Sequence, residues 1–359
     1  MQKIVTIVGA RPQFVKASAL SRALQEEDIP EVIVHTGQHF DDNMADIFFR
    51  QMEIPEPKYN LGINSLSHGA MTGRMLEEIE KVILKEKPSA VVVYGDTNST
   101  LAGALAASKL HIPVAHVEAG LRSFNMKMPE EINRILTDRI SDFLFCPTET
   151  AILNLKDEGF VHFPSRVVMS GDVMYDVAIY YSQLSSRKSN ILQELKLEPY
   201  PFILATLHRQ ENTDDPARLN DILQALNDLS EHFRIVLPLH PRTKNIIARH
   251  GIHLKFHPID PVGYFDMMEL LKRCSLVITD SGGLQKESYF FTKHCLVVRD
   301  ETEWTELVYL EYNFLVGADK TNIVQKSMEV RNIVRSFDER PYGNGDAAKK
   351  IARILKDCN

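Results

Sequence analysis

Short apolar runs in the first half of the chain end at acids that stand close to glycine. Residues 91–93 are followed closely by Asp96, and residues 114–117 lead directly into Glu118. Both runs are short, rich in β-branched residues and not alternating, which is typical of strands buried in a parallel sheet. Ligands of such sheets bind outside the carboxyl ends of the strands. We therefore expect Asp96 and Glu118 to lie at one ligand-binding edge.

The alternative for a single acid of this kind is structural. Asp96 also fits a turn residue that caps a helix predicted over residues 98–109. Taken alone, the two interpretations of Asp96 are equally good. The presence of a second acid at the end of the next strand favours a functional site.

A third acidic cluster follows at the predicted start of a helix. Proline suits the first turn, and the acids Glu130 and Glu131 complement the helix dipole there. Glu130 and Arg134 are four residues apart and share one face. They form either a surface ion pair contributing well under ~1 kcal/mol or part of the site of Asp96 and Glu118. Apolar residues at helical spacing predict the face toward the core: Ile132, Ile135, Leu136 and Ile140.

Composition indicates a soluble protein of two domains. The length of 359 residues predicts two domains at ~150 residues each. The net charge of -7 and the lack of a basic block argue against nucleic acid as a partner. No apolar run is long enough to span a membrane, and the N-terminus has no signal-peptide pattern. The scattered cysteines and histidines form no CxxC or HExxH motif, so we expect a cytoplasmic protein with reduced thiols and no metal.

Strand and helix patterns alternate through both halves of the chain, which predicts an α/β fold with two Rossmann-like, doubly wound parallel sheets. We expect an N-terminal domain over residues 1–170 and a C-terminal domain over residues 171–345. The last helix, within residues 346–359, is expected to pack back on the first domain. The strand ends of both domains are expected to face a cleft between them, where the active site lies.

The second half contains a turn suited to phosphate. Ser281, Gly282 and Gly283 follow an apolar run and precede a predicted helix. Backbone N–H groups and the helix dipole at such a turn favour a phosphate or diphosphate. The P-loop and the GxGxxG fingerprint are both absent, which argues against a dehydrogenase. A plain β–α turn is the alternative interpretation.

Other strand ends carry charged residues that extend this candidate anion site. Arg11 and Lys16 follow the first strand and Arg299 follows the last, where they either clamp a diphosphate or are solvated. Glu287 either accepts the hydroxyls of a ribose or is solvated. His208 ends a strand among polar residues, which favours a site over a capping role. The residues alone predict an anionic, hydroxylated ligand and groups for proton transfer, without selecting the reaction.

A series of motifs, in order along nearly the whole chain, resembles the non-hydrolysing UDP-N-acetylglucosamine 2-epimerase family. The motifs are GARPQF, HTGQH, YGDTNST, HVEAGLRS, PEEINR, TLHRQEN, PLHP, TDSGGLQKE and VRDETEW. The resemblance implies a GT-B-like fold, a homodimer, and no metal or nicotinamide cofactor. It implies a reaction that expels UDP, removes the C2 proton to give a glycal, and adds UDP back with C2 inverted.

The resemblance also implies roles for individual residues. Asp96 and Glu118 are the acid/base candidates, and His208 contacts the leaving diphosphate. The full set of catalytic positions is Asp96, Glu118, Glu130, Arg134 and His208. The positions implied to bind UDP are Arg11, Lys16, Ser281, Gly282, Gly283, Glu287 and Arg299. The positions implied for a second, activating UDP-sugar are Gln38, Arg209 and His240.

The chain departs from typical members in ways that resemble one branch of the family. Residues 40–43 differ from the usual run, which bears on the activating site, and the loop over residues 123–128 is short. Trp304 and Thr305 stand where arginine and proline are common. These variants resemble the branch that acts on UDP-2,3-diacetamido-2,3-dideoxy-glucuronate for surface polysaccharide synthesis. Lys127 or Arg122 is a candidate partner for the C6 carboxylate of that sugar.

Three other functions fit parts of this pattern. A GT-B glycosyltransferase shares the fold and the UDP site, and a hydrolysing epimerase releases free sugar and UDP. A catalytically silent nucleotide-sugar sensor needs only the binding residues. The acids Asp96, Glu118 and Glu130 argue against a sensor, because binding alone does not require them.

Overall fold

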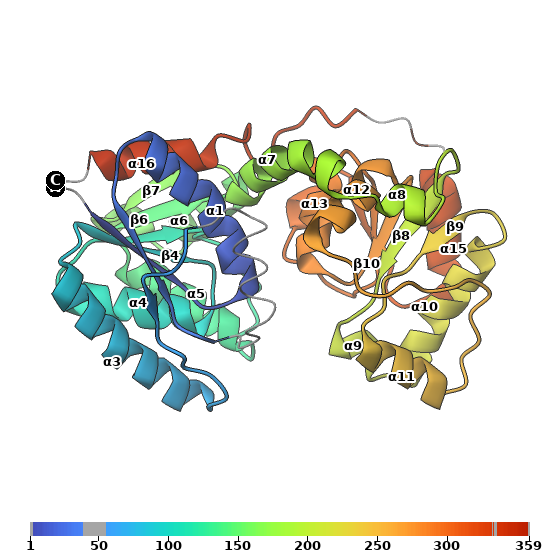
Figure 1. Ribbon diagram of the computed structural model, residues 1–359, viewed down its shortest axis with the longest axis horizontal. Coiled ribbons are helices and arrows are strands. Elements are labelled where there is room, and N and C mark those ends of the chain that lie inside the picture. Colours follow the sequence, from blue (N-terminus) through green and yellow to red (C-terminus); the bar gives the residue numbers. More distant parts are fainter. Residues whose placement is uncertain (1–2, 39–54, 332, 334–335, 358–359) are drawn as a thin grey trace. The chain divides into compact units, whose positions relative to one another are not determined.

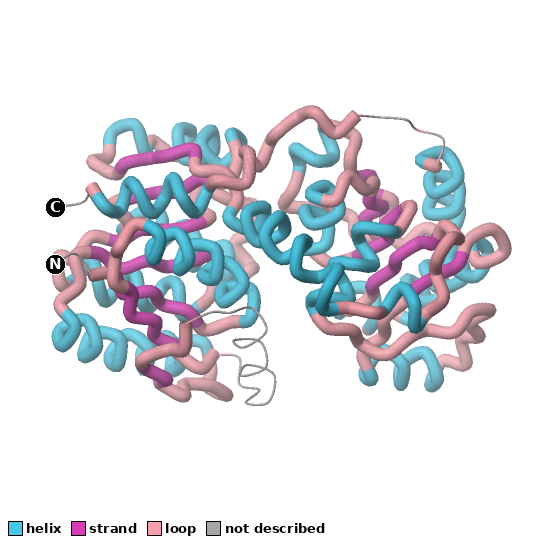
Figure 2. The backbone as a smooth tube through the Cα atoms, turned by 45° about the horizontal axis from the view of Figure 1, so that its top comes forward, coloured by secondary structure: helices cyan, strands magenta, loops and turns pink. Residues whose placement is uncertain are grey.

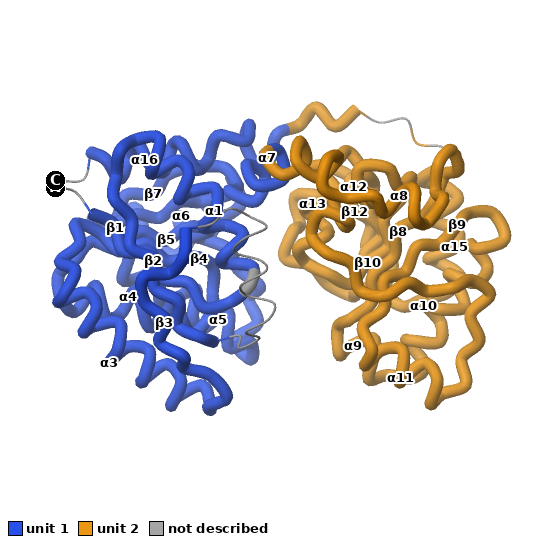
Figure 3. Tube along the Cα trace, in the orientation of Figure 1, with its two compact units in different colours: residues 1–179, 340–359 blue, residues 180–339 orange. Residues whose placement is uncertain are grey.

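The computed structural model describes residues 3–38, 55–331, 333 and 336–357. The chain divides into two compact units, shown in Figure 3. Unit 1 comprises Met1–Ile179 and Arg340–Asn359, and unit 2 comprises Tyr180–Glu339. The sequence placed the boundaries after residues 170 and 345, whereas the chain passes from one unit to the other after residues 179 and 339. The sequence pattern also predicts a helix over residues 43–52, but these residues lie outside the described part of the chain.

Unit 1 is built on a parallel sheet of seven strands in the order β3-β2-β1-β4-β5-β6-β7. Apolar runs over residues 4–8, 32–35, 91–93, 114–117 and 143–146 predict strands β1, β2, β4, β5 and β6, whereas the sequence does not predict the short β3 and the edge strand β7. The strands are β1 (Ile4–Val8), β2 (Glu31–His35), β3 (Tyr59–Asn60), β4 (Ala90–Tyr94), β5 (Val114–Val117), β6 (Phe143–Cys146) and β7 (Arg166–Met169). Strands β4 and β5 are direct neighbours, so their carboxyl ends lie side by side.

Helices cover both faces of this sheet (Figure 1). Helices α1 (Arg11–Glu26) and α16 (Ala347–Lys356) pack together on one face, so the C-terminal helix belongs to unit 1. Helices α3 (His68–Glu86), α4 (Asn98–Lys109) and α5 (Pro129–Ile140) pack in series on the other face. Helix α6 (Glu149–Asp157) and the short 3-10 helix η1 (Phe160–His162) lead into β7. Helix α7 (Val173–Lys188) runs from unit 1 into unit 2.

The buried face of α5 is not the one that its apolar residues predict. Ile132 is 40% exposed and Leu136 is 47% exposed. The residues that the helix buries are Glu131, Asn133, Arg134, Thr137 and Asp138. Asn133 and Arg134 bind Asp96 at the end of β4, and Asp138 binds His116 on β5 and Gly120 just after it. Contacts with those strand ends therefore override the apolar periodicity of the helix.

Unit 2 is built on a parallel sheet of five strands in the order β12-β11-β10-β8-β9. The strands are β8 (Phe202–Thr206), β9 (Arg234–Val236), β10 (Leu276–Thr279), β11 (Cys295–Val297) and β12 (Asn313–Leu315). Figure 2 shows the sheet between helical layers, as in unit 1. One core cluster joins it to α10 (Pro216–Leu229), α11 (Pro241–Arg249) and α15 (Lys320–Val330). A second cluster joins it to α8 (Ile191–Glu194), α12 (Tyr264–Arg273) and α13 (Gly282–Phe290).

Two short helices of unit 2 follow strand ends, namely α9 (Gln210–Thr213) after β8 and α14 (Thr305–Tyr309) after β11. The three cysteines in the described part of the chain, Cys146, Cys274 and Cys295, are free and buried. No helix among the described residues is long and apolar enough to cross a membrane.

Candidate active site

The carboxyl ends of β4 and β5 carry the two predicted acids of unit 1. Asp96 follows β4, and Glu118 follows β5, with Tyr94 in register with Val117. Gly95, with φ +62°, gives the first turn its shape. A Cβ atom on Gly95 would lie 3.3 Å from Oε2 of Glu118. A glycine at this position therefore allows the Glu118 carboxylate to lie directly against the backbone that carries Asp96.

Glu118 holds an unusual backbone conformation for a residue with a side chain. Its φ is +72°, in the left-handed region that favours glycine. The backbone N–H groups of Glu118 and Ala119 both donate to the carbonyl of Phe145, each at 3.1 Å. The end of β6 thus holds the turn in the conformation that presents the Glu118 carboxylate.

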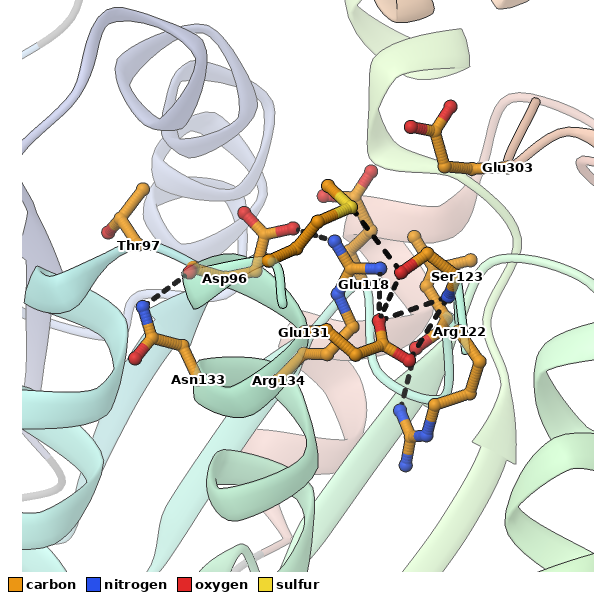
Figure 4. Close-up of polar contacts among 12 residues, drawn as sticks. Asp96, Thr97, Glu118, Arg122, Ser123, Glu131, Asn133, Arg134 and Glu303 are labelled. Atoms are coloured by element: carbon orange, nitrogen blue, oxygen red, sulfur yellow. Dashed lines mark hydrogen bonds and ion pairs between the residues drawn. The ribbon is translucent and has the colours of Figure 1, made fainter. Parts of the chain in front are cut away.

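Asp96 lies in a mostly buried site beside a cation. Its carboxylate forms an ion pair with Arg134, and its side chain is 33% exposed (Figure 4). Asn133 Nδ2 donates to the backbone carbonyl of Asp96 at 2.9 Å. Burial raises the pKa of Asp96 above its ordinary value, against the opposing effects of Arg134 and Lys16. A carboxylate with a raised pKa is a better general base than an ordinary aspartate.

Glu118 forms an ion pair with Lys16, and both side chains are mostly buried. The sequence assigned Lys16 to the diphosphate, and the structure gives it a carboxylate partner within unit 1. The two acids are therefore each matched by a cation, Asp96 by Arg134 and Glu118 by Lys16. This pairing stabilises the ionised form of two carboxylates that lie close together.

Arg134 pairs with a different glutamate of α5 than its spacing predicts. Its Nη1 lies 2.9 Å from Oε2 of Glu131, whereas Glu130 is exposed at the start of the helix. Glu131 is buried and accepts hydrogen bonds from the backbone N–H groups of Ser123 and Phe124 at 3.0 and 2.9 Å. Glu131 therefore links Arg134 to the loop over residues 123–128, as Figure 4 shows.

Arg122 is not available to a ligand. Its side chain is 1% exposed, and its guanidinium forms a bidentate pair with Glu158 at 2.6 and 2.8 Å. The same group donates to Asp138 at 2.7 Å. The prediction that Arg122 pairs with a sugar carboxylate is therefore wrong, because this guanidinium is buried and fully engaged. Lys127 lies on the exposed part of the same loop.

Gln13 has a positioning role that the sequence did not suggest. Its side chain is buried, with Oε1 accepting from the N–H groups of Gly9 and Ala10 at 2.8 and 3.0 Å. Its Nε2 donates to the carbonyl of Tyr94 at 2.8 Å. Gln13 therefore joins the end of β1 to the end of β4 just before Asp96. An amide in the GARPQF motif was the available signal, because an amide can donate and accept at once.

In unit 2, the predicted phosphate turn begins helix α13. Ser281 is the N-cap of the helix, and its hydroxyl accepts from the N–H of Leu284 at 3.4 Å. Gly282 and Gly283 form the first turn, and a Cβ on Gly283 would meet no atom within 4 Å. The first N–H groups of a helix have no partner within it. This open turn can therefore bind a phosphate through its backbone.

The buried Asp280 holds the segment that carries His208. It accepts from the backbone N–H groups of His208 and Arg209 at 3.1 and 3.0 Å, and its Oδ1 lies 3.1 Å from His208 Nδ1. Burial opposes ionisation of Asp280, but hydrogen bonds from His208 and Arg209 keep its pKa below the ordinary value. The His208 side chain is 56% exposed, so its ring is anchored at one nitrogen and open to a ligand elsewhere.

Arg299 and Trp304 flank the phosphate turn. Arg299 is buried and pairs with Glu303, with Nη1 and Oε2 3.0 Å apart. The Trp304 indole N–H donates to the carbonyl of Gly282 at 2.9 Å, and the ammonium of Lys286 lies 4.1 Å from the Trp304 ring centroid. Trp304, one of the departures noted in the sequence, therefore braces the backbone of the turn.

Burial raises the pKa of Glu287, on helix α13, to about 7.

The side chain of Arg11, the first residue of α1, lies outside the described structure.

The residues predicted for an activating ligand are distributed over both units. Gln38, in unit 1, accepts from the N–H and hydroxyl of Ser99 at 3.1 and 2.8 Å. Arg209 and His240 are in unit 2, where His240 is the N-cap of α11. Residues 40–43, which bear on the same site, lie outside the described residues. Over the described chain, no group of three or more His, Cys, Asp or Glu could hold a metal ion.

Comparison with known proteins places this geometry in a family. Residues 22–356 match the family model described as UDP-N-acetylglucosamine 2-epimerase. A UDP-2,3-diacetamido-2,3-dideoxy-D-glucuronate 2-epimerase from Pseudomonas aeruginosa is 56% identical over 355 residues, covering 98% of this chain and 99% of that protein. A UDP-N-acetylglucosamine 2-epimerase from Methanocaldococcus jannaschii is 43% identical over 364 residues, covering 98% of each.

Solved structures agree with these relatives. The M. jannaschii UDP-GlcNAc 2-epimerase in complex with UDP-GlcNAc and UDP has a TM-score of 0.86 and 42% identity, covering 99% of each chain. The Neisseria meningitidis UDP-GlcNAc 2-epimerase bound to UDP-GlcNAc has a TM-score of 0.86 and 31% identity, covering 99% of this chain and 100% of that one.

The fold is thus GT-B-like, and the protein is a nucleotide-sugar 2-epimerase, an isomerase. It belongs to the UDP-N-acetylglucosamine 2-epimerase family.

Proposed function

We propose that this protein inverts C2 of a UDP-2-acetamido sugar and that UDP-2,3-diacetamido-2,3-dideoxy-glucuronate is its preferred substrate. The observation that carries the proposal is the placement of Asp96 and Glu118 at adjacent strand ends, each paired with a cation. Binding alone does not require such a pair of acids. The preference for the uronate is supported by the relative of 56% identity that acts on that sugar.

The chemistry starts from a C2–H bond that is not next to a carbonyl, so simple enolisation is not available. The C1–O bond breaks instead, and its electron pair leaves with UDP. Positive charge at C1 makes the C2 proton acidic, and a carboxylate accepts that proton while the C1–C2 double bond forms. UDP then adds back to C1, and a proton is delivered to the opposite face of C2. An anionic environment stabilises the charge that develops at C1.

We assign the proton transfers to Asp96 and Glu118, with Arg134 orienting Asp96 and Lys16 balancing Glu118. The exposed Glu130 acts with them as an orienting acid. A carboxylate whose pKa is raised by burial, as in Asp96, suits a proton acceptor near neutral pH. Which of the two carboxylates removes the proton from a given epimer depends on the face that it meets.

We assign UDP to the strand ends of unit 2 and to cations of α1. The N-terminal turn of α13 and His208 contact the diphosphate, and Arg299 contributes positive charge. Glu287 accepts the ribose hydroxyls. The complete proposed set is Arg11, Lys16, His208, Ser281, Gly282, Gly283, Glu287 and Arg299. Backbone donors and fixed cations stabilise the charge of the departing UDP.

Further proposals follow from the family. Lys127, on an exposed loop that Glu131 holds in place, pairs with the C6 carboxylate of the uronate. Gln38, Arg209 and His240 contact a second, activating UDP-sugar. The protein is a homodimer of the cytoplasm that supplies a precursor for surface polysaccharide.

Product analysis tests the proposal. The protein is incubated separately with UDP-N-acetylglucosamine and with the diacetamido-glucuronate nucleotide, and anomeric protons are followed by NMR. A manno-configured UDP-sugar that forms faster from the uronate supports both parts. Faster turnover of UDP-N-acetylglucosamine refutes the uronate preference. Release of free sugar with UDP identifies a hydrolase, and two unchanged nucleotides refute the epimerase.

A further inference from the structure

A buried histidine–aspartate pair lies beneath the two acid-bearing strand ends of unit 1. His116 is on β5 and Asp138 is on α5, and neither side chain is exposed. His116 Nδ1 lies 2.7 Å from Asp138 Oδ1. Neither residue is among the catalytic or binding positions assigned above. Burying a polar pair of this kind costs desolvation free energy, which is offset only when its hydrogen bonds have good geometry.

The histidine holds the backbone next to Asp96. His116 Nε2 lies 2.7 Å from the carbonyl oxygen of Gly95. A carbonyl can only accept, so Nε2 is the donor in this bond. The carbonyl belongs to the peptide unit that joins Gly95 to Asp96. The hydrogen bond therefore fixes the orientation of the backbone from which the Asp96 side chain projects.

The aspartate holds the turn that carries Glu118. Asp138 Oδ2 accepts from the backbone N–H of Gly120 at 3.1 Å. Glu118 and Gly120 both have left-handed backbone conformations, with φ of +72° and +79°. Such a turn persists only when its surroundings determine it. Asp138, on helix α5, supplies part of that constraint through its hydrogen bond to Gly120.

Arg122 completes the network and fixes the aspartate itself. Its Nη1 donates to Asp138 Oδ2 at 2.7 Å, while Nε and Nη2 are engaged by Glu158. A guanidinium only donates, so Asp138 presents Oδ2 as an acceptor to both Arg122 and Gly120. Asp138 thus binds the backbone just after Glu118 directly, and it connects to the backbone just before Asp96 through His116.

We infer that His116 and Asp138 form a positioning unit that sets the placement of Asp96 relative to Glu118 for proton transfer at C2. The inference rests on the proposed function, since it concerns the same acids. Neither residue touches substrate. Their effect is on geometry, and a displacement of about 1 Å in a reacting group is enough to lower a rate about 100-fold.

The experiment compares two substitutions of the same histidine. His116→Phe keeps a flat ring of similar size but removes both hydrogen bonds. His116→Gln retains a donor that can reach the Gly95 carbonyl, because the glutamine Nε2 stands about as far from the backbone as the imidazole Nε2. We expect kcat for C2 inversion to fall about 100-fold in His116→Phe and clearly less in His116→Gln. The Kd for UDP should stay within about twofold in both, since unit 2 supplies most of the proposed UDP contacts.

A matched control separates positioning from ordinary structural damage. Glu86 is buried and accepts from Lys3 at 2.8 Å, Lys58 at 2.7 Å and the Tyr59 hydroxyl at 2.5 Å. Its partner Lys3 stands just before β1, at the opposite end of the sheet from Asp96 and Glu118. We expect Glu86→Gln to lower the melting temperature without lowering kcat per UDP-binding molecule.

Each outcome bears on the inference. A kcat that is lowered in His116→Phe, partly recovered in His116→Gln and unchanged in Glu86→Gln, with UDP binding intact, supports it. A wild-type kcat in the folded His116→Phe protein overturns this inference and leaves the proposed function standing. A wild-type protein that does not invert C2 overturns both. Should His116→Phe not fold, Asp138→Asn replaces it, and an unchanged kcat there overturns the inference equally.

Discussion

Replacing Asp280 by asparagine tests whether a buried carboxylate holds His208 in position. Asp280 Oδ2 accepts from two backbone N–H groups, and its Oδ1 lies 3.1 Å from His208 Nδ1. An asparagine keeps one acceptor but turns an NH₂ group toward remaining donors. Hydrogen bonds to a charged group are each worth about 1.5–3 kcal/mol. The loss of two predicts a decrease of about 3 kcal/mol or more in the unfolding free energy of unit 2.

The effect on turnover follows from the same contacts. Without Asp280, the His208 ring loses its fixed orientation toward the leaving diphosphate, and we expect kcat/KM to fall about 100-fold. Urea unfolding and steady-state kinetics measure the two quantities. Asp260→Asn is the matched control, because Asp260 is 88% exposed and forms a surface ion pair with Lys244, so its loss costs about 0–1 kcal/mol.

The pH dependence of this effect has a definite sign. The pKa of Asp280 is lowered in the folded protein, so its contribution to stability is complete above the ordinary aspartate range and is lost as pH falls below it. The stability difference between wild type and Asp280→Asn should therefore be constant from about pH 5 to 8 and shrink in more acidic solution. A variant with wild-type stability and kcat/KM within about threefold would refute the assignment of Asp280 as the anchor of His208.

Other predictions concern Glu287 in the proposed ribose site, Gly95 beside the two acids, and Lys127 as the partner of the uronate. The pKa of Glu287 is raised by burial to about 7. Because the ionised form accepts both ribose hydroxyls, UDP affinity measured by calorimetry should fall as pH drops through 7. Glu287→Gln should bind UDP weakly at every pH, and a pH dependence in that variant parallel to the wild type would contradict the role. Gly95→Ala should lower the unfolding free energy by about 1–2 kcal/mol, because its φ is +62°. It should also lower kcat about tenfold, because the new Cβ would lie 3.3 Å from Glu118 Oε2. Gly62→Ala has the same φ and open space around it, so it should cost similar stability with unchanged kcat; equal kcat values in the two variants would contradict the reasoning. Lys127→Glu should lower kcat/KM for the uronate about 100-fold, the value of about 2.7 kcal/mol for a lost charged pair turned repulsive, with UDP-N-acetylglucosamine turnover within about threefold; a similar loss on both substrates would refute a selective contact.

The strand ends were predictable from the sequence because their signal is local. Short β-branched runs that stop at an acid or a glycine identify buried parallel strands, and such strands align their carboxyl ends whatever the intervening loops do. Asp96 and Glu118 therefore follow the ends of adjacent strands, and the Ser281 turn begins a helix, as the sequence indicated.

Partner choice was not predictable because it depends on residues distant in the sequence. Spacing paired Arg134 with Glu130, but the guanidinium binds Asp96 at the end of β4 and Glu131. Glu131 also accepts hydrogen bonds from the loop over residues 123–128. The same contacts bury the polar face of α5 and expose Ile132 and Leu136. Helical periodicity reports an apolar face well only when the core is what the helix packs against.

Two buried polar residues, Arg122 and His116, gave no sequence signal of their roles. Arg122 was a candidate partner for the sugar carboxylate by resemblance to one branch of the family, yet it is engaged by Glu158 and Asp138. His116 lies within an apolar strand, where a histidine is usually a satisfied core residue. Its link to the backbone beside Asp96 is apparent only once β4 and β5 are paired.

The most direct test of the central claim is deuterium incorporation at C2. The protein is incubated with its UDP-sugar in D₂O, and the C2 proton signals of substrate and product are followed by NMR. If the acids at the ends of β4 and β5 exchange the C2 proton, deuterium enters C2 as the manno epimer forms, and Asp96→Asn suppresses the exchange. C2 inversion that retains the original hydrogen, or wild-type exchange in Asp96→Asn, would contradict the account.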